Sequence, residues 1–229
     1  LFRGIFQQND RRHLDGTFFY PKLGFGTIFE RMAQKIGHQS LHCGSRVTRL
    51  SHAGGTIQTI ELNGVERLPA QIVISSLPLP LILDILHPKP PKELLDIAQN
   101  MRYRNLLLSV FCFDKPFYSE NASIYFPSEK IPFTRLYESK NRSPHMAPAG
   151  KTAIVLEVPC HAGDEIWKTA DEGIIDRVYS ALHLVEPIDR KDILQAAVYR
   201  MPFAYPILEV GYESKVGELL GYLGQFANL

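Results

Sequence analysis

The sequence lacks the cysteine patterns, the charge excess and the long apolar runs that assign many proteins to a class. Its three cysteines, Cys43, Cys112 and Cys160, are far apart and form no CxxC pair, so we expect free thiols rather than disulfides or a zinc site. The 25 lysines and arginines balance 24 aspartates and glutamates, and a formal charge of +1 gives no electrostatic basis for binding nucleic acid or an anionic membrane.

Targeting segments are absent as well. No stretch resembles a secretion signal, and the longest apolar run is too short to span a bilayer. We therefore predict a cytoplasmic protein without a membrane span. The chain starts at Leu1 without a methionine and ends at Leu229 directly after a strongly patterned helix, so we expect it to be a piece of a longer protein.

Catalytic motifs that can be recognised from spacing are also missing. In LGFGTIF, Gly24 and Gly26 fit a dinucleotide-binding fingerprint, but Phe29 occupies the place of the third glycine. This favours a tight turn that leads into a helix. The chain contains no G-x-S-x-G elbow for acyl transfer. Any difficult chemistry is therefore expected to belong to a cofactor.

Two groups of candidate metal ligands have unsuitable spacing. His38 and His42 are four residues apart, but Gly37 ends the predicted helix before them. The stretch PCHAGDE (159–165) gathers four side chains of ligand type without any zinc-site spacing, and hydrogen bonding within a loop explains it better. We predict no metal site.

Apolar periodicity predicts four helices and a larger number of strands. The helices are expected at 25–36, after the proline cluster 88–91, at 169–182 with Thr169 and Glu172 at capping-box spacing, and at 213–226, where internal glycines predict close packing against a neighbour. A meander with turns at Gly54–Gly55 and Asn63–Gly64 precedes QIVISS (71–76), a β-branched run typical of a strand covered on both faces. Further strands are expected at 104–113, 122–127, 131–140, 151–160 and 192–208.

The mixed order of these elements predicts the α+β class. We expect a substrate-binding domain with a mixed or antiparallel sheet and helices, formed by 1–22 and 87–229. Residues 23–86 are expected to form a partial FAD- or NAD(P)-binding domain of Rossmann-like type, inserted into the first.

Aromatic and basic side chains recur on the predicted strands. In IPFTRLYESK (131–140), alternation predicts that Phe133, Arg135 and Tyr137 share one face of a strand. A buried arginine needs a partner, and two remain open: the carboxylate of Glu157 on a neighbouring strand, or an anionic ligand. The candidate substrate-binding residues are Tyr125, Arg135, Tyr137, Arg200 and Tyr205.

A second candidate site lies where QIVISS ends. Ser75 and Ser76 place small residues and backbone amides at the C-terminal end of the predicted strand, where nucleotide-binding sheets hold their ligands. An ordinary core strand followed by a proline turn at Pro78 explains the same pattern, so both readings stay open.

The most specific signal comes from four stretches in a fixed order: FYPKLGFGTIFERMAQKIG, SRVTRL…GGTIQTIEL…AQIVISSLPLP, IPFTRLYESKNRSP and PFAYPILEVGYE. Together they resemble the middle of the FAD-dependent amine oxidase and protoporphyrinogen oxidase superfamily, with the UDP-galactopyranose-mutase-like proteins as a near branch. The family's N-terminal GxGxxG segment and its C-terminal flavin-contacting segment have no counterpart here.

The resemblance implies FAD as the cofactor and assigns roles to two groups of residues. The strand SRVTRL is expected to lie under the adenine, with the backbone of Val47 in contact, and the end of VISSLP is expected to approach the cofactor. The implied FAD-binding residues are Arg46, Val47, Ser75, Ser76, Leu77 and Pro78. Arg135 is expected to face an anionic or phosphorylated small-molecule substrate, with Tyr137 and Tyr205 as walls of the cavity.

The resemblance also implies an activity, the transfer of a hydride from a small organic substrate to FAD. The isolated piece is expected to be inactive and to hold flavin weakly, because the pyrophosphate cradle is missing. Two alternatives stay open: a non-redox flavin-dependent mutase of nucleotide sugars, in which Arg135 and Arg200 grip a diphosphate, and a ligand-binding domain without flavin. No catalytic residue is assigned. The uncovered Rossmann-like remnant is also expected to pair with another chain, which predicts a homo-oligomer.

Overall fold

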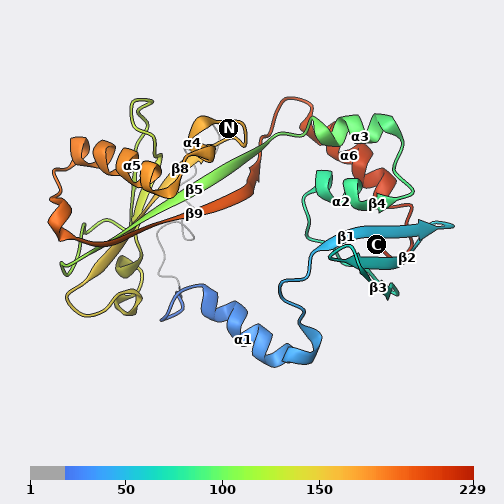
Figure 1. The fold of residues 1–229 in the computed structure, drawn as a ribbon, viewed down its shortest axis with the longest axis horizontal. Coiled ribbons are helices and arrows are strands. Elements are labelled where there is room, and N and C mark those ends of the chain that lie inside the picture. The colour runs from blue at the N-terminus through green and yellow to red at the C-terminus, as the bar shows by residue number, and fades with distance from the viewer. Residues whose placement is uncertain (1–18) are drawn as a thin grey trace, which may run out of the picture.

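The computed structural model describes residues 19–229 and contains two lobes that are joined by long strands (Figure 1). The predicted segment 1–22 therefore lies largely outside the described residues. Six α-helices and nine strands form in the described part, with helices and sheets segregated within each lobe, which confirms the α+β class. None of the helices in residues 19–229 has the length and apolarity needed to cross a bilayer.

The smaller lobe, on the right of Figure 1, is built on a four-stranded sheet in the order β3-β2-β1-β4, in which β4 is parallel to β1 and the other pairs are antiparallel. Gly54–Gly55 and Asn63–Gly64 form its two hairpin turns, as predicted, with positive φ at all four residues. The elements of this lobe are β1 (Val47–Ala53), β2 (Thr56–Leu62), β3 (Glu66–Pro69), α2 (Leu79–Ile85), β4 (Leu86–His87), α3 (Lys92–Gln99) and α6 (Tyr212–Leu223).

The larger lobe is built on a five-stranded antiparallel sheet in the order β6-β7-β8-β5-β9. Its helix α5 packs Ile174, Val178 and Leu182 onto one face of the sheet, where Leu107 and Leu156 are also buried. Among residues 19–229, no α-helix packs on the opposite face. The elements are β5 (Tyr103–Phe113), β6 (Ser123–Tyr125), β7 (Arg135–Glu138), β8 (Thr152–Cys160), α4 (Glu165–Lys168), α5 (Asp171–Val185) and β9 (Ile193–Pro206).

The boundary between the two hydrophobic cores does not follow the predicted domain boundary after residue 86. Helices α3 and α6 were assigned to the substrate-binding domain, but Ala98, Leu219 and Leu223 are buried in the core of the smaller lobe, together with Leu50 of β1. The chain enters the larger lobe along β5 and returns along β9. The smaller lobe is therefore completed by the C-terminal helix, a long-range contact that local patterns do not reveal.

The predicted buried strand 71–76 is wrong for this chain. The segment is extended but belongs to no sheet, and the side chains of Ile72 and Ile74 are 78% and 94% exposed. Its β-branched composition suits a strand with neighbours on both edges and cover on both faces, and residues 19–229 supply neither. One backbone contact orders it, since the amide of Val73 donates to the carbonyl of Asn228 at 2.7 Å.

Two local predictions in the larger lobe are also wrong. β7 begins only at Arg135, so Phe133 does not continue the strand alternation and is buried in the core that also holds Leu136. The predicted capping box is absent, because the N-cap of α5 is Ala170 without a side-chain hydrogen bond, and the hydroxyl of Thr169 donates to the carbonyl of Glu165.

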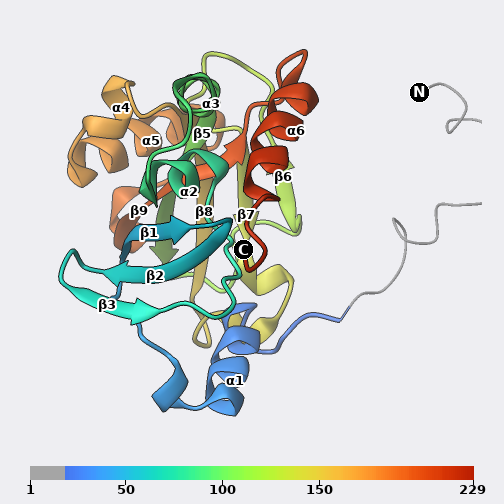
Figure 2. The same ribbon diagram turned by 90° about the vertical axis from the view of Figure 1, so that its right-hand side faces the viewer.

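Two amphipathic helices leave apolar or small residues uncovered. Helix α1 (Gly26–Ile36) ends at Gly37 with a φ of 87°, as predicted, but none of its residues is buried, and Figures 1 and 2 both show it apart from the two sheets. In α6, a Cβ atom at Gly217 or Gly221 would meet nothing within 4 Å. The predicted close packing at these glycines is therefore absent among residues 19–229.

Candidate functional site

The candidate cofactor site is a cavity of about 540 Å³ between the start of β1, the extended segment 72–77 and helix α2. The cavity brings together Arg46 and Ser75, which lie almost thirty positions apart in the sequence. Five of the six predicted cofactor-binding residues line it, namely Arg46, Val47, Ser75, Ser76 and Leu77. The sixth, Pro78, is the N-cap residue of α2 and directly follows the lining segment.

The cavity combines apolar walls with a polar rim. Leu50, Ile60 and Leu81 line it from β1, β2 and α2, and Ser45 and Arg46 line it from the chain that leads into β1. Its volume lies within the range of roughly 300–1,000 Å³ that is common for small-molecule sites. A flat, partly polar ring system suits such walls, and the lining residues include no glycine-rich turn at a helix N-terminus of the kind that holds phosphate groups.

Helix α2, which forms one wall, was missed in the sequence analysis. Its signal was present, since Leu79, Ile82 and Leu83 have the i, i+3, i+4 spacing of a buried helical face. Proline residues before and inside the stretch favour a turn. Pro80 is tolerated because it lies in the first helical turn, where no intrahelical amide bond is needed.

The candidate substrate site lies on the open face of the five-stranded sheet. Arg135 is directly opposite Glu157 in the β7–β8 ladder, and its Nη2 donates to Oε1 of Glu157. This hydrogen bond raises the pKa of the Arg135 guanidinium above its ordinary value. Of the two partners that the sequence left open, the structure therefore supplies the carboxylate. The Nε of Arg135 is buried and has no hydrogen-bond partner among the described residues.

Three tyrosines surround this ion pair. Tyr125 is opposite Arg135 in the β6–β7 ladder, and the Arg135 guanidinium lies 5.3 Å from the centre of the Tyr137 ring. Burial raises the pKa of Tyr137 and of Tyr205, and in both cases the negative charge of Glu157 adds to the effect. Four of the five predicted substrate-binding residues, those at 125, 135, 137 and 205, thus gather around Glu157.

Arg200 lies elsewhere. Leu107 of β5 is opposite both Val158 and Arg200 in the sheet, and Leu107 and Val158 are buried under α5. The Arg200 guanidinium accordingly reaches the helical layer, where it donates to the carboxylate of Asp171 and, at 2.6 Å, to the carbonyl of Thr169. It is therefore on the opposite face of the sheet from Arg135.

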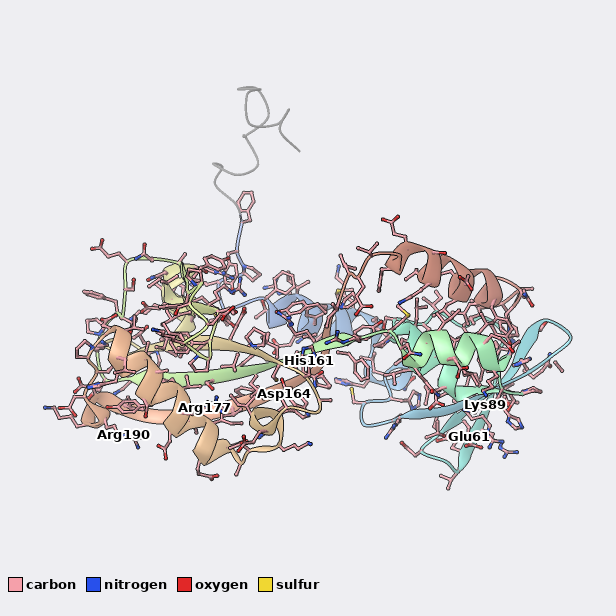
Figure 3. The ribbon with its side chains drawn as sticks, turned by 90° about the horizontal axis from the view of Figure 1, so that it is seen from above. Glu61, Lys89, His161, Asp164, Arg177 and Arg190 are labelled. Atoms are coloured by element: carbon pink, nitrogen blue, oxygen red, sulfur yellow. The ribbon has the colours of Figure 1, made fainter. Side chains whose placement is uncertain are left out.

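The PCHAGDE stretch forms a loop at the end of β8, where Figure 3 labels His161 and Asp164. The amide of His161 donates to the carboxylate of Asp164 at 2.7 Å, which is the loop hydrogen bonding that the spacing indicated. Burial raises the pKa of the adjacent Cys160 thiol to about 11, so this thiol is protonated at neutral pH. Residues 19–229 contain no cluster of three or more histidine, cysteine, aspartate or glutamate side chains that could hold a metal ion.

The sequence matches a family model described as flavin-containing amine oxidoreductase over residues 4–213. A search of curated proteins found no match. The described fold resembles a reduced UDP-galactopyranose mutase, with 18% identity, a TM-score of 0.73, and coverage of 89% of this chain and 46% of the mutase.

Two oxidases are also similar. A putative protoporphyrinogen oxidase from Exiguobacterium sp. 255-15 gives 15% identity, a TM-score of 0.74, and coverage of 93% of this chain and 46% of that protein. A double mutant of putrescine oxidase gives 16% identity, a TM-score of 0.57, and coverage of 77% and 38%. At these identities the likeness concerns the fold alone. This chain spans less than half the length of each of the three proteins.

Proposed function

Because the chain belongs to the family of flavin-containing amine oxidoreductases, we propose that it forms the central part of an FAD-dependent oxidoreductase that takes a hydride from a small organic substrate. The observation that carries the proposal is the cavity between β1 and the segment 72–77. Its lining contains Arg46, Val47, Ser75, Ser76 and Leu77, which the family resemblance implies as FAD-binding residues.

The cavity fits one part of FAD. Its apolar walls, Leu50 and Ile60 among them, suit the flat adenine, and Ser45 and Arg46 offer polar groups for the attached ribose. No glycine-rich turn at a helix N-terminus lines it, so these residues do not hold a pyrophosphate. When bound, the flavin supplies the hydride acceptor. The chain's own residues in this lobe bind and orient the nucleotide end.

The open face of the larger sheet is the proposed substrate surface. Tyr125, Tyr137 and Tyr205 provide aromatic walls, and the Arg135–Glu157 pair adds fixed polar groups of opposite sign. Because Glu157 neutralises Arg135, an anionic substrate group has to share the guanidinium with that carboxylate. The guanidinium has five N–H donors and the bond to Glu157 uses one of them, at Nη2, so donors remain for such a group. Alanine at Arg135 is expected to weaken substrate binding.

The test is a visible absorbance spectrum of the protein expressed from its complete native reading frame, followed by titration of the flavin-free form with FAD. A flavin spectrum that bleaches under a reductant supports the proposal. Ser76→Trp, which fills the cavity, is expected to weaken FAD binding at least tenfold. Ser214→Trp, on another exposed serine that lies on α6 and does not line the cavity, serves as the control. A colourless folded protein that does not take up FAD contradicts the proposal and favours a binding domain without flavin.

A mutase acting on nucleotide sugars is the second candidate, since the fold resembles a UDP-galactopyranose mutase with a TM-score of 0.73. That function called for Arg135 and Arg200 to grip one diphosphate. The two arginines lie on opposite faces of the sheet, and each donates to a carboxylate, which weighs against this role. Binding of a UDP-sugar that both Arg135→Ala and Arg200→Ala abolish, without loss of folding, would favour the mutase.

A further inference from the structure

The long ladder between β5 and β9, which leads from the larger lobe to the smaller one, is interrupted by a bulge near the start of β5 (Figure 1). The ladder pairs on its two sides are Leu106–Met201 and Arg104–Tyr205. Between them β5 advances by two residues and β9 by four, so β9 carries two extra residues opposite Asn105. Pro202, which has no amide to give to a ladder, lies in this stretch, and within sheets proline is confined to edges and bulges.

The backbone of the bulge is strained. Phe203, in its middle, has a left-handed backbone with a φ of 54°. A bulky residue rarely adopts this conformation and keeps it only where its surroundings impose it. Here Asn105, which is 5% exposed, accepts a hydrogen bond from the Phe203 amide through its Oδ1 atom at 3.1 Å. The side chain of Asn105 therefore holds the bulge.

The bulge connects the proposed substrate surface to the lobe with the cofactor cavity. Burial, and after it the negative charge of Glu157, raises the pKa of the Tyr205 phenol, so these two side chains lie close together on the substrate surface. In the other direction, the ring of Phe203 packs edge-on against Tyr103, with 5.2 Å between the ring centres. Tyr103 in turn packs against the core of the smaller lobe. One short stretch of β9 thus contacts both parts of the proposed active site.

We propose that Asn105 is a positioning residue: by holding Phe203 in the left-handed conformation, it fixes the place of Tyr205 on the substrate surface. The inference rests on the proposed function, in which Tyr205 is one of the aromatic walls that meet the substrate. Asn105 itself does not touch the substrate in this scheme. It acts through the course of the β9 backbone.

The alternative that Asn105 prevents is a regular ladder. Without the bulge, β9 would continue in register beyond the Leu106–Met201 pair, and Phe203 instead of Tyr205 would stand opposite Arg104. Because a strand rises by about 3.3 Å per residue, Tyr205 would then lie roughly 7 Å farther along the sheet, away from Glu157. The substrate surface would lose a phenolic hydroxyl and gain an aromatic ring without one.

NMR of tyrosine labelled with ¹³C at Cζ follows the ionisation of each phenol in the protein expressed from its complete native reading frame, and Tyr205→Phe identifies the resonance of Tyr205. Asn105→Leu removes the acceptor at similar side-chain size. We expect it to shift this resonance and to lower the pKa of Tyr205 toward the ordinary value of about 10. Asn105→Asp keeps an acceptor of the same shape, so the pKa of Tyr205 should stay raised.

A second substitution tests the cause. Glycine adopts the left-handed conformation at no steric cost, so Phe203→Gly in the Asn105→Leu background is expected to restore the bulge and the resonance of Tyr205. Asn100→Leu is the matched control and should leave Tyr205 unchanged, because Asn100 also bonds to the backbone, at the carbonyl of Asp96, but lies outside the ladder.

An unchanged resonance and pKa of Tyr205 in a folded Asn105→Leu variant overturns the proposal. If Asn105→Leu does not fold, the double variant decides: a folded protein with the wild-type Tyr205 resonance supports the proposal, and a failure to fold or a displaced resonance overturns it. None of these readouts requires flavin. A protein that passes this test but takes up no FAD would contradict the proposed function alone.

Discussion

The buried carboxylate of Glu138 offers the sharpest test of how the larger lobe is held together. It is completely buried and accepts hydrogen bonds from the amides of Tyr118, at 3.0 Å, and Ser119, at 2.9 Å, as well as from the hydroxyl of Thr152. It forms no ion pair among the described residues. The carboxylate therefore acts as an acceptor that fastens the loop after β5 to strands β7 and β8.

Replacement by alanine removes the acceptor for two backbone amides, one hydroxyl and the side-chain amide of Asn141, which donates at 3.5 Å. Each buried donor left without a partner costs about 1–3 kcal/mol, and partial relaxation of the loop limits the sum, so we expect Glu138→Ala to lower the free energy of unfolding by about 3–5 kcal/mol. Glu138→Gln keeps the shape and one acceptor oxygen, and is expected to lose about 1–2 kcal/mol.

Urea denaturation followed by circular dichroism measures these losses. With a slope of about 3 kcal/mol per M of urea, the alanine variant shifts the midpoint by roughly 1–1.7 M. Hydrogen exchange should show faster opening at Tyr118 and Ser119. Glu120→Ala, an exposed change on the same loop, serves as the control and is expected to have little effect. A loss below about 1 kcal/mol for Glu138→Ala would refute the reasoning.

Three further predictions concern stability. Gly217→Ala and Gly221→Ala should each raise the free energy of unfolding by about 0.5–1 kcal/mol, because a Cβ atom fits at both positions and alanine favours a helix. Thermal denaturation measures the change. A decrease in stability instead would mean that another segment packs on these glycines. Arg200→Ala should cost about 2 kcal/mol in urea denaturation, because the guanidinium binds the start of α5, and Arg200→Lys should restore only part of it. Burial raises the pKa of Tyr118, so its hydroxyl stays protonated to a higher pH in the folded state than in the unfolded state. The free energy of unfolding should therefore fall as the pH rises above about 10. Tyr118→Phe should reduce this fall, and an unchanged pH profile in that variant would contradict the assignment.

Local patterns predicted much of the fold, because hairpin turns and helix ends depend on a few neighbouring residues. The positive φ of Asn63 and Gly64 follows from the turn that they form, and the end of α1 follows from Gly37. The pairing of Arg135 with Glu157 was one of two stated alternatives, because an arginine on a half-buried strand requires an acceptor. The grouping of Val47 with Ser75 and Ser76 came from the family resemblance; the three residues line one cavity, and their contact with FAD stays a prediction.

Other features depended on contacts that no local pattern contains. The same β-branched run, 71–76, forms a buried strand where neighbouring strands exist and an exposed extended segment where, as in residues 19–229, they do not. Arg200 and Arg135 look alike in the sequence, but the strand register places them on opposite faces of one sheet. The sequence by itself thus determined the turns, most of the helices and the family, since these rest on short-range propensity and on the order of four motifs along the chain. Only the tertiary structure decided which charged groups meet and which helices complete each core, because each depends on residues brought together from distant parts of the chain.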